Sequence, residues 1–179
     1  ASMKIRLAAA LTDDSMVDGP GLMTAIWTQG CIHNCKGRHD PQTHDVEGGF
    51  LTDTNDIIGQ LKKLKLQKGI TLSGGDPFLQ ASGLVPVARA AKELGMDVWA
   101  YTGFKWEQLM NPKHTFYTDF INLLECIDVL VDGRFIESQK SPELLFRGSS
   151  NQRIIDVGKS LNQKGLILME EYMKEQKMQ

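Results

Sequence analysis

The chain has 179 residues, with 20 Lys and Arg against 22 Asp and Glu, which suits one domain with almost no net charge. This near balance does not indicate nucleic acid or an anionic membrane as a partner. No apolar run is long enough to span a bilayer, and the first residues lack a signal-peptide pattern. We therefore expect a cytoplasmic protein whose single domain covers residues 1–179.

Short apolar runs that predict strands alternate with segments that predict helices. In chain order we predict a strand over residues 24–29, a helix from an N-cap within 52–55 to about 64, a strand over 69–73, a helix over about 79–94, a strand over 97–102, helices over 106–110 and 118–124, strands over 127–131 and 152–157, and a helix over 167–177. This alternation favours an α/β fold with a parallel sheet covered by helices.

Ligands of such sheets bind at the carboxyl ends of the strands. Four segments with polar or glycine residues directly follow predicted strands, and they should share one edge of the sheet. They are the segment that begins at Cys31, the turn Gly74-Gly75-Asp76-Pro77, Thr102-Gly103, and Asp132-Gly133-Arg134.

The first of these segments carries Cys31 and Cys35, with three residues between them, and Arg38 where a third cysteine would complete an iron–sulfur triplet. Three thiolates from one loop can hold three irons of a 4Fe–4S cluster and leave the fourth open to substrate. Arginine cannot replace a thiolate, because it has only donors and keeps its positive charge. By themselves the two cysteines are more simply interpreted as a pair of buried or loop thiols, and the rest of the sequence favours the cluster. Their close spacing does not suit a secreted disulfide framework.

The second segment, with Ser73 before Gly74, Gly75 and Asp76, suits an ammonium ligand. Glycines let a ligand approach the backbone, and exposed carbonyls and a carboxylate accept hydrogen bonds from a cation. A plain turn at the end of a strand is the simpler interpretation of these residues alone, and the upstream cysteines favour the ligand site. Cys126 lies in an apolar run and is expected in the core.

Several further motifs make the chain resemble the activating proteins of anaerobic ribonucleoside-triphosphate reductases, which are small radical S-adenosylmethionine (SAM) enzymes. The resemblance covers nearly the whole chain and rests on Val17-Asp18-Gly19-Pro20-Gly21, Gln29-Gly30-Cys31-Ile32-His33-Asn34-Cys35, Pro41-Gln42-Thr43-His44, Leu72-Ser73-Gly74-Gly75-Asp76-Pro77, Tyr101-Thr102-Gly103, Val131-Asp132-Gly133-Arg134 and residues 147–153. The family usually has Cys-x3-Cys-x2-Cys followed by His-Asn-Pro, whereas this chain has Arg38 and Asp40 on either side of His39.

The resemblance implies a radical SAM type of incomplete parallel (β/α) barrel with about five or six strands. It implies a 4Fe–4S cluster on Cys31 and Cys35, and SAM whose adenine lies beside Gly37, Arg38 and His39. A one-electron cleavage of SAM would yield a radical that removes a hydrogen from a glycine of the reductase. The implied partners are that reductase and an electron donor such as flavodoxin or ferredoxin, and no residue is assigned as catalytic.

Two interpretations of Asp132 and Arg134 stay open. Asp132 could contact the ribose or a bound cation, with Arg134 on the methionine carboxylate, or the two could belong to surface ion pairs of little energetic value. Arg147 and Arg153 could likewise bind the partner or hold their own loop.

Three functions also stay open: an active radical SAM activase, a form without a cluster that still binds the reductase, and a small zinc-binding interaction module. The last would use Cys31, Cys35 and His39, with His33 and His44 nearby, although this spacing matches no standard zinc motif.

Overall fold

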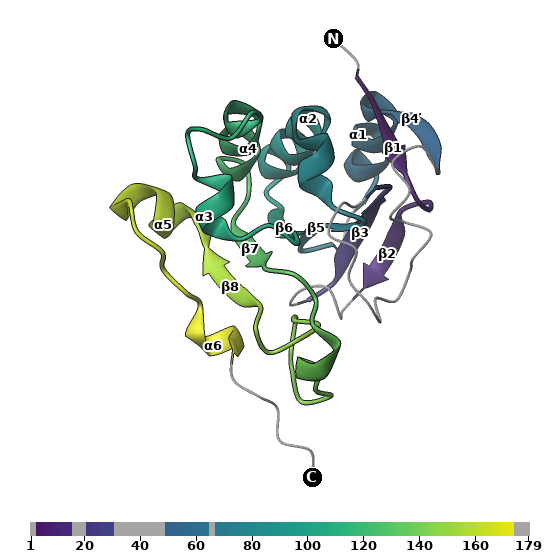
Figure 1. Cartoon of the computed structure of the whole chain (residues 1–179). Coiled ribbons are helices and arrows are strands. Elements are labelled where there is room, and N and C mark those ends of the chain that lie inside the picture. The colour runs from purple at the N-terminus through teal and green to yellow at the C-terminus, as the bar shows by residue number, and fades with distance from the viewer. Residues whose placement is uncertain (1–2, 16–20, 31–48, 65–66, 174–179) are drawn as a thin grey trace.

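The computed structural model describes residues 3–15, 21–30, 49–64 and 67–173, and its strands form one mixed sheet (Figure 1). Within these residues there are eight strands: β1 (Lys4–Leu7), β2 (Thr12–Ser15), β3 (Met23–Thr28), β4 (Phe50–Asp53), β5 (Gly69–Gly74), β6 (Asp97–Tyr101), β7 (Val129–Asp132) and β8 (Arg153–Asp156). The order across the sheet is β4-β1-β3-β5-β6-β7-β8, and β2 pairs with β3. The sheet is open, because no pairing joins β4 to β8 in the described part of the chain.

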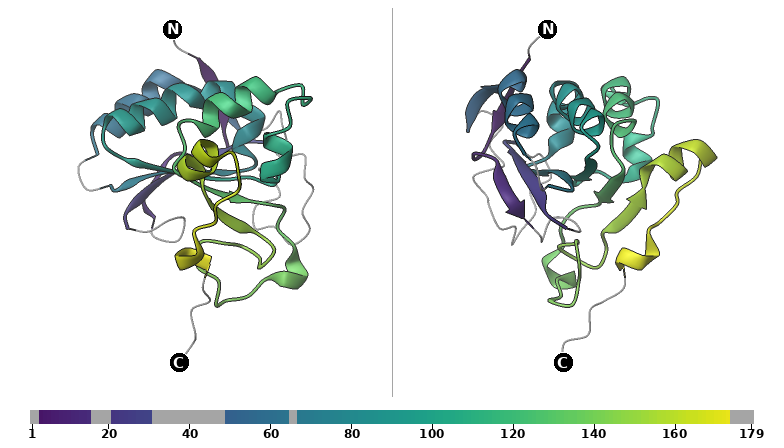
Figure 2. Two further views of the ribbon diagram at one scale, coloured as in Figure 1. Left: turned by 90° about the vertical axis from the view of Figure 1, so that its left-hand side faces the viewer. Right: turned by 180° about the vertical axis from the view of Figure 1, so that it is seen from behind.

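The helices lie mainly over one face of the sheet, as Figure 2 shows from two further sides. They are α1 (Thr54–Lys62), α2 (Ala81–Glu93), α3 (Trp106–Leu109), α4 (Tyr117–Leu124), α5 (Val157–Gln163) and α6 (Glu170–Met173), with short 3₁₀ helices η2 (Pro77–Gln80) and η3 (Glu137–Gln139). Helices α1, α2 and α4 pack side by side. None of the described helices is long and apolar enough to cross a lipid bilayer.

The four central strands are parallel, as the alternation of strands and helices predicted, but the flanks of the sheet are not. Strands β3, β5, β6 and β7 run parallel, whereas β1, β2, β4 and β8 pair antiparallel with their neighbours. The prediction of a parallel sheet is therefore wrong for β8. A parallel connection needs a crossover, usually a helix, and residues 133–152 instead form a loop with η3 that returns at the same end of β7.

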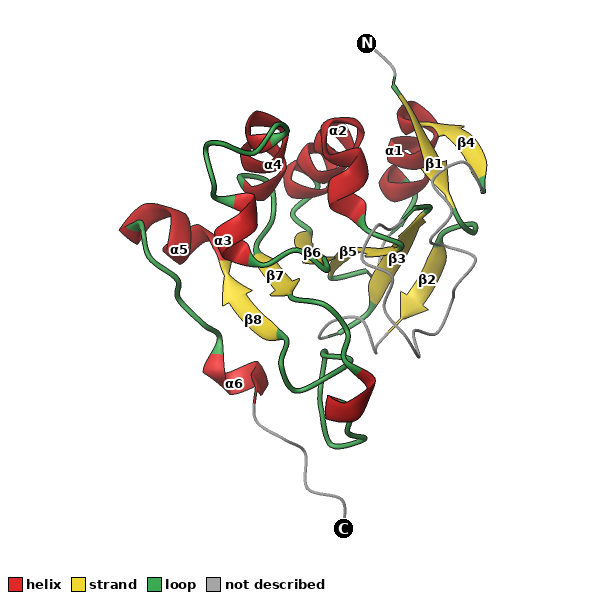
Figure 3. Cartoon of the chain, in the orientation of Figure 1, coloured by secondary structure: helices red, strands yellow, loops and turns green. Residues whose placement is uncertain are grey.

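The predicted elements correspond to β3, β5, β6, β7, β8 and to α1 through α4 within a few residues (Figure 3). Three N-terminal strands, β1, β2 and β4, were not predicted, and neither was α5. The helix predicted over residues 167–177 is shorter in the described part of the chain, where only Glu170–Met173 is helical, and residues 174–177 lie outside it.

Both faces of the central strands are buried, which explains their near-continuous apolar sequences. The residues that face the helices are Ile70, Leu72, Val98, Ala100 and Leu130. The residues on the other face are Met23, Trp99, Val129, Val131 and Ile154. There the ring of Trp99 lies 5.4 Å from that of Phe146 and 5.5 Å from that of Tyr172, so the C-terminal segment with α6 covers this face.

The close pairing of β5 with β6 leads to a prediction for two glycines. A Cβ at Gly69 would lie 2.3 Å from the carbonyl oxygen of Asp97, whereas a Cβ at Gly59, inside α1, would meet nothing within 4 Å. We expect Gly69→Ala to lower the free energy of unfolding by about 1–3 kcal/mol, the usual cost of overpacking. The matched variant Gly59→Ala should raise it by about 0.5–1 kcal/mol, since alanine favours a helix. Urea unfolding measures both, and equal stabilities would contradict the tight β5–β6 contact.

Candidate functional site

Segments that follow three neighbouring parallel strands meet at one edge of the sheet, as the sequence predicted. The amide of Gly75 donates to the carbonyl of Thr28 at 2.8 Å, and the amide of Asp76 donates to the carbonyl of Gly30 at 2.6 Å. Gly30 is the residue before Cys31, so the segment that contains the cysteines leaves the sheet beside the Gly74-Gly75 turn. The predicted site residues Cys31, Cys35, Gly37, Arg38 and His39 themselves lie outside the described residues.

Gly74 permits the close contact between the ends of β3 and β5. Its φ angle is +101°, and a Cβ at this position would lie 2.4 Å from the carbonyl oxygen and 2.5 Å from the amide nitrogen of Thr28. The hydroxyl of Thr28 also donates to the carbonyl of Ser73 at 2.9 Å. Ser73 and Gly74 are only half-buried. We call Ser73, Gly74 and Gly75 the glycine shelf, whose position is fixed by these bonds to the end of β3.

The carboxylate of Asp76 faces the protein interior and is fully buried. It accepts hydrogen bonds from the hydroxyl of Thr102 at 2.9 and 3.0 Å, from the amide of Gly103 at 3.0 Å, and from the amide of Phe78 at 3.0 Å. These bonds cap η2 and join the carboxyl ends of β5 and β6. Asp76 thus has a structural role, and its predicted contact with a ligand ammonium stays a prediction.

Asp132 is also buried, at 1% exposure, and it forms an ion pair with Arg153. Its two oxygens accept from the Nε and Nη2 atoms of Arg153 at 3.0 and 2.6 Å, and Oδ2 also accepts from the amide of Trp106 at 2.7 Å. The alternative of a surface ion pair is therefore wrong for Asp132, because this pair is buried on one side and links β7 to β8. The predicted contact with ribose or a cation stays a prediction.

Arg153 bridges Asp132 to Glu107 on α3, at 2.7 Å from its Nη2 atom to Oε1. The hydrogen bond to Asp132 raises the pKa of Arg153, against the smaller opposing effect of burial. Partial burial acts to raise the pKa of Glu107, but the hydrogen bond from Arg153, a backbone hydrogen bond and the charges of Arg153 and Lys105 together outweigh it, so this pKa is lowered. Arg153 and Glu107 thus both stay charged near neutral pH.

Side chains of the segment 147–153 form hydrogen bonds with the backbone of the same loop. Arg147 donates to the carbonyls of Ser150, Gln152 and Met173 at 3.2, 3.0 and 2.9 Å. The side chain of Gln152 donates to the carbonyl of Gly133 at 2.9 Å and accepts from the amides of Gly148 and Ser149. Of the two interpretations left open, the structure supports the role within the loop for Arg147, whereas Arg153 joins β8 to β7 and to α3. The side chain of Arg134, by contrast, is exposed at the same edge.

Sequence patterns missed one residue that shapes this edge. The side chain of Gln80 donates to the carbonyls of Arg6 and Gln29, at 2.8 and 3.1 Å, and accepts from the amide of Arg6 at 2.7 Å. It therefore ties η2 to β1 and to the residue before Gly30. Its position inside a predicted helix gave no signal of this role, because the partner strand β1 was not predicted.

The remaining metal-binding candidates are not brought together in the described residues. Cys126 is buried just before β7, at the amino end of the parallel strands, and burial raises its pKa. The prediction that it belongs to the core is confirmed. No group of three or more His, Cys, Asp or Glu residues that could hold a metal occurs within the described ranges. His33, His39 and His44, which the zinc alternative needs, lie outside them.

Comparisons with known proteins agree with the motifs at this edge. The family model of a 4Fe-4S single cluster domain matches residues 17–155. An anaerobic ribonucleoside-triphosphate reductase-activating protein of Haemophilus influenzae is 36% identical over 147 residues, which cover 78% of this chain and 90% of that protein. A protein with the same name from Escherichia coli K12 is 34% identical over 146 residues, which cover 76% of this chain and 90% of that protein. Its counterpart from Enterobacteria phage T4 is 32% identical over 146 residues, which cover 77% of this chain and 86% of that protein.

The buried bonds of Asp76 predict a strong effect at Thr102. In Thr102→Val the carboxylate loses its hydroxyl donor, so we expect the free energy of unfolding to fall by about 1.5–3 kcal/mol, the range for hydrogen bonds to charged groups. Thr102→Ser keeps the hydroxyl and loses one methyl group, which should cost less than about 1 kcal/mol. Urea unfolding of both variants is the measurement, and a valine variant as stable as the serine variant would show that this bond contributes little.

The lowered pKa of Glu107 predicts a pH dependence of stability. Because the folded pKa lies below the unfolded value of about 4.3, the stabilisation is present at neutral pH and is lost as the pH falls through the folded pKa. We expect the loss of unfolding free energy between pH 7 and pH 3.5 to be smaller in Glu107→Gln than in the parent protein. Glu93→Gln on α2 is the control and should keep the parent's pH dependence. Identical acid profiles of the parent and Glu107→Gln would contradict the ion pair.

Proposed function

The chain belongs to the family of anaerobic ribonucleoside-triphosphate reductase-activating proteins, and on that basis we propose that it activates such a reductase by forming a glycyl radical on it. The observation that best supports this proposal is the bond between Asp76 and Gly30, since it holds the glycine shelf beside the start of the cysteine segment. A radical SAM activase needs its cluster ligands and its SAM-binding backbone at one edge of the sheet.

The residues at this edge fit the proposed cofactors in part. The half-buried Ser73 and Gly74 present backbone next to the cysteine segment, where carbonyls can accept from the ammonium of SAM. The exposed guanidinium of Arg134 at the same edge suits the methionine carboxylate, because a guanidinium can donate two parallel hydrogen bonds to a carboxylate. Cys31 and Cys35 provide two thiolates for a 4Fe–4S cluster, whereas Arg38 provides none.

When bound, the cluster would supply the electron that cleaves SAM, and the protein contributes binding, orientation and the exclusion of water. The bonds of Thr28, Gly30 and Thr102 hold the shelf rigid before any ligand arrives. Gly37, Arg38 and His39 would lie beside the adenine, as the family resemblance implies. Flavodoxin or ferredoxin would be the electron donor, and the protein would act in the cytoplasm.

The parallel strands β3, β5, β6 and β7 with their helices support the proposal of an incomplete radical SAM barrel. The open sheet leaves one side of such a barrel without strands, which would admit a segment of a large partner. The mixed flanks are additions to this core.

Arg38 favours a second candidate function, a form that binds the reductase without forming the radical. Among the described residues the only further cysteine is Cys126, which is buried at the opposite end of the strands. The printed sequence has three cysteines in all, so a third thiolate for a cluster on Cys31 and Cys35 has to come from another molecule. Without it, a cluster on Cys31 and Cys35 would be labile.

The variant Arg38→Cys separates the two functions. After anaerobic reconstitution we expect its iron and sulfide content to approach that of one full cluster, well above the parent protein, because a third thiolate then completes the triplet. The matched variant Arg38→Ser removes the arginine without adding a thiolate and should stay near the parent's content. Pull-down of the reductase should be equal in all three proteins. If Arg38→Cys binds no more iron than Arg38→Ser, position 38 is not the site of the third ligand.

A further inference from the structure

The C-terminal segment of residues 166–173, which we call the strap, lies on the face of the sheet that α1, α2 and α4 leave open (Figure 2). It pairs with the outer edge of β8, the last strand in the order of the sheet. There the amide of Asp156 donates to the carbonyl of Ile167 at 2.9 Å, and the amide of Met169 donates to the carbonyl of Ile154 at 2.8 Å. The apolar side chains that the strap covers are those of Met23, Trp99, Val129, Val131 and Ile154. Neither the activation of a reductase nor the binding of SAM assigns a role to the strap.

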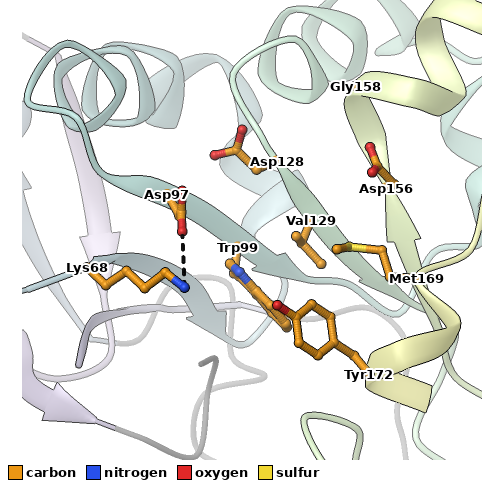
Figure 4. Close-up of a pocket in the computed structure, with 9 residues that line it drawn as sticks. All are labelled: Lys68, Asp97, Trp99, Asp128, Val129, Asp156, Gly158, Met169 and Tyr172. Carbon is orange, nitrogen blue, oxygen red and sulfur yellow. Dashed lines mark ion pairs between the residues drawn. The ribbon is translucent and has the colours of Figure 1, made fainter. Parts of the chain in front are cut away.

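The strap is packed loosely for a segment that covers a buried face. None of its eight residues is buried, and its helix α6 is a single turn, which has no stability of its own in water. A cavity of about 280 Å³ lies between Met169 and Tyr172 of the strap and Trp99 and Val129 of the sheet (Figure 4). Well-packed interiors contain few voids larger than a water molecule. A segment with so few buried side chains opens at a lower free energy than the core strands do.

The end of the strap is held by the loop between β7 and β8. The Nη2 atom of Arg147 donates to the carbonyl of Met173 at 2.9 Å, and the ring of Tyr172 lies 5.6 Å from that of Phe146 and 5.5 Å from that of Trp99. Phe146 has a φ angle of +62°, in the left-handed region that bulky residues rarely adopt. Such a conformation persists only where neighbouring contacts hold it. The closed strap and the strained Phe146 therefore depend on each other, and opening of the strap would release the strain.

The cavity itself is better explained by this loose packing than by a small-molecule ligand. Each of its aspartates already has a partner in the protein. Asp97 forms an ion pair with Lys68, Asp128 forms one with Lys92, and Asp156 accepts from a backbone amide as the N-cap of α5. No acidic side chain of the cavity is therefore left to a small-molecule ligand.

We infer that the strap is an autoinhibitory cover, and that an extended segment of the reductase displaces it and takes its place on the edge of β8. The inference rests on the proposed function, which supplies the identity of the partner. An extended segment can accept from the amide of Asp156 and donate to the carbonyl of Ile154, as the strap does. Addition of a strand to a free sheet edge is a common mode of peptide recognition. Because Arg153 at the start of β8 pairs with Asp132, the docked segment lies beside the edge that carries the glycine shelf.

The first test is hydrogen–deuterium exchange of the full-length protein, measured by mass spectrometry. Tyr172→Ala removes two ring contacts of the strap, so we expect the peptide 166–173 to exchange about tenfold faster than in the parent protein. Peptides from β5 and β6 should exchange at the parent's rate, which would show that the sheet stays folded. Glu171→Ala, at the exposed neighbouring position of α6, is the matched control and should leave the exchange of the strap unchanged.

The second test is a calorimetric titration of the same proteins with the reductase. A closed strap lowers the apparent affinity by the fraction of molecules that are open, so Tyr172→Ala should bind the reductase about tenfold more tightly than the parent protein. Glu171→Ala should bind as the parent does. In the complex, the peptide 166–173 should exchange faster than in the free protein. The peptide 153–157 of β8 should stay protected, because the docked segment replaces the bonds of the strap.

The outcomes separate this inference from the proposed function. If the parent protein binds the reductase and Tyr172→Ala binds it equally well or more weakly, the strap only stabilises the fold, and the inference is overturned while the proposed function stands. Exchange of the strap that is as slow in the complex as in the free protein, or as slow in Tyr172→Ala as in the parent, also overturns the inference. If none of the three proteins binds the reductase, the proposed function fails and the inference fails with it.

Discussion

The buried carboxylate of Asp76 fixes the edge of the sheet on which the proposed chemistry depends. A carboxylate without exposure is tolerated only when its oxygens are hydrogen-bonded, and here Thr102, Gly103 and Phe78 supply the donors. These donors belong to η2 and to the end of β6, while the amide of Asp76 itself donates to Gly30 after β3. One side chain and its amide thus hold three neighbouring strand ends in a single arrangement before any ligand binds.

A second buried and hydrogen-bonded aspartate lies one strand further along the sheet. Asp132 is buried at the end of β7 and takes its donors from Arg153 on β8 and from Trp106 at the start of α3. Breaking such a pair leaves a buried charge without compensation, which is more costly than the pair's net value suggests. The edge is therefore rigid because its acidic side chains point into the protein. Arg134, by contrast, is an exposed side chain at this edge.

These contacts explain which features the sequence predicted and which it did not. Strands β5 and β6 are continuous apolar runs, and the turns after them marked the correct edge of the sheet. The same turns could not show that Asp76 faces inward. An acidic residue after a strand gives the same sequence pattern whether its carboxylate binds a ligand or a protein amide. Strand β2, with the sequence TDDS, and the antiparallel direction of β8 were unpredictable from local pattern, since pairing with distant strands determines both.

The contacts of the edge also separate folding from cofactor binding. The bonds that position the shelf within the described residues join Thr28, Gly30, Asp76 and Thr102. A replacement at position 38 leaves the atoms of these four residues unchanged. Selection on the fold and on the partner surface can act on such a chain even where the third thiolate is missing. The family membership is clear from the whole chain, whereas the proposed loss of the cluster rests on a single position.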